Sequence, residues 1–164
     1  MLKLLVGLTA IVAQGTAETQ PCVTRQQVAD ATVILIPELI SGAQARCREH
    51  LSADSFILQP AATQFAERAR AERDQRTASA AAGLRIISGD ELPGMRDETV
   101  VAMMGEGLAG QMMQNANPSQ CRDVNVLIES VASLAPIQIG NFLGAMFGLA
   151  GVGGGNSGPP ICRQ

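Results

Sequence analysis

The sequence contains no tryptophan, no tyrosine and only four phenylalanines among its 164 residues. Aromatic rings form the platforms on which sugar-binding sites stack their ligands, so carbohydrate binding is poorly supported. Lys3 is the single lysine and His50 the single histidine. The 15 acidic residues outnumber the 11 arginines, which leaves no basic surplus for a phosphate backbone. We therefore expect no nucleic-acid partner.

Side chains suited to catalysis or metal binding are equally scarce. Glu38, in an apolar segment beside Pro37, is a candidate general acid, but a carboxylate there also suits the start of a helical segment. Cys47 and His50 share a helix face at a spacing that metal ligands use, yet the sequence has no CxxC pair and oxidation would compete with thiolate ligation. We expect no catalytic residue, no metal and no cofactor.

The N-terminus predicts export. Lys3 precedes an apolar stretch, Leu4 to Val12, and small residues follow it. This is the layout of a secretory signal peptide, and its apolar part is too short to span a membrane permanently; the alternative is a buried N-terminal helix. We expect cleavage after residue 15 or 17, with the signal peptide at 1–17. Arginine without lysine, among abundant alanine and glycine, suggests a GC-rich bacterial genome, and hence a periplasmic or secreted protein.

All four cysteines lie in the mature chain: Cys22, Cys47, Cys121 and Cys162. An even number in an exported chain predicts two disulfides. A straight helix over 24–46 would separate Cys22 from Cys47 by roughly 35 Å at 1.5 Å per residue, whereas bridged Cα atoms lie within about 7 Å. That pair requires a full chain reversal near Pro37. Otherwise Cys47 pairs with Cys121 or Cys162, and we favour Cys47–Cys121 with Cys22–Cys162.

Hydrophobic spacing predicts an all-α fold, a bundle of four to five helices stabilised by two disulfides. It forms a single domain, 18–164, with a glycine-rich tail at 151–164. The helices are expected at 24–50, 60–83, 95–115, from Ser119 or Asp123 to 136, and at 136–150.

Local signals refine these helices. Thr24 and Gln27 predict a capping box, and Pro37 a kink or break near residue 36. The apolar run around Pro37 indicates central burial of the first helix. The second helix, in which arginines alternate with acids, is expected to hold loosely and to project. In the third, the inner stripe is Val101, Met104, Leu108 and Met112, for which we favour core packing over an adaptable groove or a Cu(I) site.

The segment from Ser130 to Cys162 has no charged residue. Gly140, Gly144 and Gly148 recur every fourth position and form a face that lets another backbone approach closely. We favour close packing in a soluble fold. The alternatives are an association face for self-association or reversible membrane contact, and a membrane span. A span over 134–152 would place Cys162 in the reducing compartment and leave an odd number of cysteines outside.

Several short motifs carry a resemblance: Cys22-x-Thr24, Leu35/Ile36-Pro37, Arg46-Cys47, Ala53-Asp54-x-Phe56 and Cys121. Together they resemble a group of uncharacterised four-cysteine exported helical proteins of Gram-negative bacteria, a resemblance that implies no activity. We hypothesise an exported, non-enzymatic helical protein that binds an unknown protein partner or has a structural role. The alternatives are a membrane-active or self-associating protein that uses the glycine face, and a small enzyme that uses Glu38 or His50.

Overall fold

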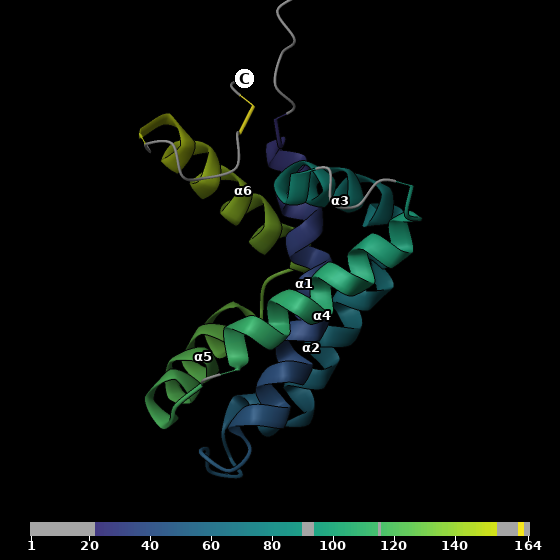
Figure 1. Cartoon of the computed structure of the whole chain (residues 1–164). Helices are drawn as coiled ribbons and strands as arrows, with labels where there is room; N and C mark the ends of the chain where they lie inside the picture. The colour runs from purple at the N-terminus through teal and green to yellow at the C-terminus, as the bar shows by residue number, and fades with distance from the viewer. Residues whose placement is uncertain (1–21, 90–93, 115, 154–160, 163–164) are drawn as a thin grey trace, which may run out of the picture.

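The computed structural model describes residues 22–89, 94–114, 116–153 and 161–162 (Figure 1). The elements in chain order are α1 (Arg25–Cys47), the 3-10 helix η1 (Phe56–Leu58), α2 (Pro60–Ala71), α3 (Arg73–Ser88), α4 (Asp97–Met113), α5 (Pro118–Val131) and α6 (Pro136–Gly153). The all-α prediction is confirmed, with six α-helices in these ranges in place of the expected four to five. The predicted signal peptide, 1–17, and positions 154–160 and 163–164 of the predicted tail lie outside the described residues.

The additional helix arises at Glu72, where the expected 60–83 helix divides into α2 and α3. The Glu72 backbone keeps helical angles while its N–H donates to the carbonyls of Ala69 and Arg70, so a tight turn changes the helix direction without a glycine or proline. Gly83, which was expected to end this helix, lies inside α3 instead. A Cβ there would lie 2.8 Å from Cβ of Gln27, so this glycine permits close packing on α1.

Helix α1 is the centre of the fold, as its apolar sequence predicts. It begins with the expected capping box, in which the Gln27 N–H donates to Oγ1 of Thr24 at 3.1 Å and the Thr24 N–H donates to Oε1 of Gln27 at 2.8 Å. The helix continues through Pro37, which is buried, so of the predicted kink or break near residue 36 the break does not occur. Because every other α-helix contacts α1, its wide apolar surface is enclosed by the rest of the chain.

Three clusters of buried side chains form the core, and α1 contributes to each. The first joins α1 to α3 and α4, with Leu84 and Val100 among its members. The second joins α1 to α2 around Phe65. The third joins the end of α1 to η1, α4 and α5 around Ile57. The core is therefore a set of contacts along one helix, and α1 alone contributes to all three clusters.

The arginine-rich region does not project, contrary to expectation. Ala80 and Ala81 of α3 are fully buried against α1, because small side chains let the two helices approach. Arg76 donates to Oδ1 of Asp30 at 2.7 Å and to Oε2 of Glu72 at 2.6 Å. Burial of Arg76 opposes its charge, but the hydrogen bonds and charges of Asp30 and Glu72 outweigh this and raise the pKa of Arg76.

The inner face of α4 also differs from the expected stripe. Val101 is buried as predicted, whereas Met104 and Leu108 are only partly buried, and the side chain of Met112 lies outside the description. Small residues face α1 instead. A Cβ at Gly105 would lie 3.4 Å from Cγ of Glu38, so the helices are too close for large residues at this point. The other buried side chains of α4 are Val100, Ala109 and Met113.

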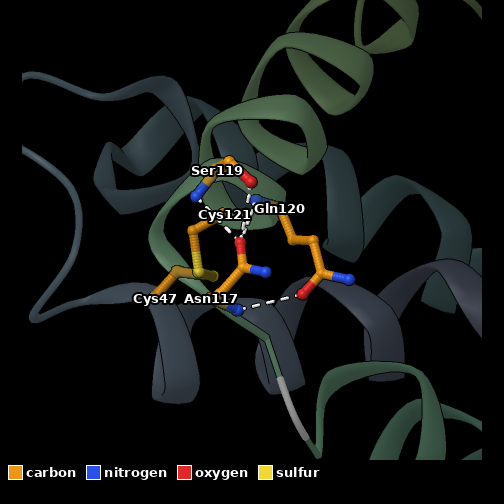
Figure 2. The surroundings of a disulfide bond; sticks show 5 residues. All are labelled: Cys47, Asn117, Ser119, Gln120 and Cys121. Atoms are coloured by element: carbon orange, nitrogen blue, oxygen red, sulfur yellow. Dashed lines mark hydrogen bonds between the residues drawn. A yellow bond between two sulfur atoms is a disulfide. The ribbon is translucent and has the colours of Figure 1, made fainter.

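Both disulfides form the favoured pairs. Cys47–Cys121 joins the end of α1 to the first turn of α5 with a Cα–Cα distance of 5.4 Å, and both residues are fully buried. Figure 2 shows Asn117 beside it, whose side-chain oxygen accepts from the N–H groups of Ser119 and Gln120. Asn117 is thus the N-cap of α5, in place of the expected start at Ser119 or Asp123.

The second disulfide, Cys22–Cys162, closes the two ends of the described chain at a Cα–Cα distance of 5.0 Å. Val23 and Ile161 form a short parallel bridge beside it, in which the Cys162 N–H donates to the carbonyl of Val23 at 3.0 Å. Ile161 comes eight residues after the end of α6, and its bridge to Val23 brings the chain back to the beginning of α1.

Candidate interaction surface

The glycine face of α6 lies against α1 of the same chain. A Cβ at Gly140 would overlap the carbonyl oxygen of Ala29, and one at Gly144 would lie 2.6 Å from the carbonyl oxygen of Arg25. At Gly148 the nearest atom would be Nε of Arg25, also at 2.6 Å. The three glycines therefore serve a close helix–helix contact inside the fold. Self-association through them would first require α1 to be displaced.

Three large apolar residues on the side of α6 opposite the glycines are exposed, and so is Phe147 on the flank of the helix. Phe142 is 64% exposed, Met146 50%, Phe147 51% and Leu149 69%. We call these four residues the α6 outer face. They hold two of the four phenylalanines in the sequence and lie within the 33-residue segment that carries no charge. Taking about 200 Å² for a large side chain, they present on the order of 400 Å² of apolar surface.

A patch of this size is within the range of the largest apolar patches on monomeric proteins, about 300–600 Å², which are often functional. Three of its members, Phe142, Met146 and Leu149, follow one another at spacings of four and three residues and so form a stripe along the helix. The small, exposed Ala145 follows Phe142 by three residues and so lies on the same side of the helix. Gln138 and Asn141, both exposed, border the stripe toward the helix start.

The fold holds α6 firmly at its beginning. Pro136 is buried, Ile137 and Ile139 pack against the cluster around Phe65, and the Ala135 N–H donates to Oε1 of Gln138 at 3.0 Å. In the preceding turn, the Arg68 guanidinium donates to the carbonyl of Ala132. With these anchors at one end and the glycine contacts along its length, α6 presents the outer face as a rigid surface.

Helix α5 exposes two further apolar side chains, Val126 at 63% and Leu127 at 62%. Hydrophobic spacing in this segment predicts an inner stripe of Val124, Leu127, Ile128, Val131 and Leu134. The inner stripe is narrower than expected, because α5 lies at the edge of the fold and packs mainly on η1. The Ile57 N–H of η1 donates to Oδ1 of Asn125 at 2.9 Å, which fixes the rotation of α5 and turns Leu127 outward.

Within the part of the chain that the structure describes, two segments are long and apolar enough to cross a membrane. One is α1, which is the core helix. The other is the pair α5 and α6 taken together, bent by 113° where they meet. The glycine face of α6 is packed on α1, so a span through α6 would have to remove this contact.

The residues considered for chemistry are not brought together. Glu38 is half-buried and lies 3.7 Å from Arg73, as an ion pair between α1 and α3. The sulfur of Cys47 is bonded to Cys121, so the less favoured alternative of Cys47 and His50 as metal ligands is excluded for this thiol, and His50 is exposed in the turn after α1. Among the described residues, no group of three potential metal-ligating side chains is gathered.

Comparison of the chain with protein-family models, curated proteins and solved structures yields no match. The surface itself must therefore carry the functional inference.

Proposed function

We propose that this chain is an exported, disulfide-stabilised helical protein that acts by binding a protein partner through the α6 outer face. The two disulfides support the location, because such bonds persist in oxidising compartments and are rare in the cytosol. The predicted signal peptide supports the same location.

The exposure of Phe142, Met146, Phe147 and Leu149 on a rigid helix carries the proposal. Burying a large apolar side chain contributes about 1.5–3 kcal/mol relative to leaving it in water. In the unbound chain the four side chains of the α6 outer face stay in water, so this stabilisation is gained only when a partner covers them. Because the face is held by α1 and the α5–α6 turn, a partner need not order it first, which lowers the entropic cost of association.

Site-specific photo-crosslinking in the exporting cell tests the proposal. A photoreactive phenylalanine analogue replaces Phe142, whose ring it resembles, and in a matched variant it replaces Gln75, an exposed residue of α3. We expect a covalent adduct at position 142 and none at position 75 after irradiation. Equal labelling at both positions, or no adduct at 142, would contradict a binding role for this face.

A further inference from the structure

We propose that the occupant of the α6 outer face is a second copy of this chain, with the two α6 helices packed against each other across a two-fold axis. This inference rests on the proposed function, because it assigns the partner of the same surface.

Charge favours this occupant. In a two-fold interface each patch meets an identical patch, so any charged residue near the axis faces its own sign. The segment from Ser130 to Cys162 avoids this repulsion entirely, since none of its residues is charged. Helices that lie on anionic membranes carry lysine or arginine on their polar face. Helix α6 has neither, and acidic residues exceed arginines in the chain as a whole.

Shape supports the same pairing. The stripe of Phe142, Met146 and Leu149 provides large side chains at helical spacing, and Ala145 provides a small side chain beside them. Two such stripes can interdigitate, the large residues of one copy lying over the small residue of the other. The glycine face on the other side of α6 stays on α1, so dimer formation requires no rearrangement of the fold.

The area of the patch places the dimer among small interfaces. Two copies would bury about 800 Å² through the outer faces alone, below the 1,200–2,000 Å² of a standard stable interface. We therefore expect a reversible dimer whose population rises with protein concentration.

Sedimentation velocity of the exported chain over a hundredfold concentration range tests this inference. We expect a shift from monomer to dimer in the wild type and at least a tenfold weaker dimer for Met146→Glu, which places two like charges near the axis. Gln75→Glu adds the same charge on α3 and should leave the dimer unchanged. Leu149→Gln, at the most exposed position of the face, gives a second weakening variant if Met146→Glu does not fold.

The mass of the adduct at position 142 separates the two proposals. An adduct of twice the chain mass supports the second copy. A heavier or lighter adduct with a monomeric wild type overturns the second copy but leaves the proposed function standing, while the absence of any adduct overturns both. Binding of a monomeric chain to vesicles of phosphatidylcholine and phosphatidylglycerol, lost in Met146→Glu, would also overturn the second copy and indicate a membrane surface.

Discussion

Helices α1 and α6 are both long and apolar, but the fold treats them differently. Helix α1 supplies residues to all three core clusters and is surrounded by the other helices. Helix α6 buries a narrow line of Pro136 and three glycines and exposes Phe142, Phe147 and Leu149. The difference follows from where the large residues lie. In α1 they point toward neighbours in the same chain, whereas in α6 small residues make the internal contact and large ones face outward.

This contrast shows that the apolar composition of a helix does not by itself identify the surface against which the helix packs. Apolar composition indicates that a surface will be buried, and the position of the small residues indicates which side comes closest to a neighbouring backbone. For α1 the partner lies within the chain. For the outer face of α6 we have proposed a second copy.

The largest loss of stability is expected on removal of Cys47–Cys121, the disulfide that fixes the end of α1. Replacing Cys47 and Cys121 together by alanine should lower the free energy of unfolding by about 4 kcal/mol, because a loop of 74 residues is released in the unfolded chain. Denaturant unfolding measures this loss. In the wild type, mild reduction followed by alkylation and mass spectrometry should open Cys22–Cys162 first, since those residues are only partly buried. Simultaneous opening of both bonds would show that burial does not protect Cys47–Cys121.

A smaller loss of stability is expected when the buried Asp30 of α1 is replaced. Replacing Asp30, whose side chain is 5% exposed, by alanine removes the partner that draws Arg76 onto α1. We expect a loss of about 2 kcal/mol, below the usual range for a broken buried pair because Glu72 still binds Arg76. Glu67→Ala breaks the exposed Arg70–Glu67 pair and should cost less than about 0.5 kcal/mol. Equal costs in thermal unfolding would mean that Asp30 does not hold α3.

The glycine contact between the two helices gives the third comparison. Gly144→Ala places a methyl group against the carbonyl of Arg25 and should destabilise the fold by about 1–3 kcal/mol. Gly107→Ala, in α4, meets no atom within 4 Å and should instead stabilise by up to about 1 kcal/mol, since alanine favours helix. Opposite shifts in melting temperature are the expected result. A neutral Gly144→Ala would refute the close contact.

The smallest effect is expected on the outer face. Phe142→Ser should change the stability of the dilute monomer by no more than about 0.5 kcal/mol. The same replacement at Phe65, which is 2% exposed, should lower the free energy of unfolding by about 4 kcal/mol. Calorimetry at low protein concentration makes this comparison. A large loss for Phe142→Ser would place that ring inside the fold and remove the basis of the binding surface.

Local signals in the sequence predicted much of this structure. The capping box at Thr24 and the central position of α1 depend on neighbouring residues, and these follow from the sequence. Helix length argued against Cys22–Cys47 but left two pairings open, of which the favoured one forms. Interactions between residues far apart in the sequence could not be predicted in this way. The Asp30–Arg76 pair joins residues 46 positions apart, and no periodicity connects them. Gly83 fits a helix end and a close contact equally well, and only the position of Gln27 distinguishes the two.

The candidate surface was predicted only in part. The spacing of Gly140, Gly144 and Gly148 identified the correct helix and the correct close-packing face. It did not indicate that the same helix would present Phe142 and Phe147 to solvent, because exposure depends on which elements cover α6. The rotation of α5, which turns Leu127 outward, likewise depends on its contact with η1.

The Cys22–Cys162 bond has a mechanical consequence. It joins two residues 140 positions apart in the sequence whose Cα atoms lie 5.0 Å apart. A force that pulls on both ends passes through this covalent bond, and the helices between them bear none of the load. With this bond alone reduced, the chain would extend through α1, α5 and α6, while Cys47–Cys121 still keeps α2 to α4 out of the load path. Single-molecule stretching would therefore report the state of one disulfide as a difference in contour length.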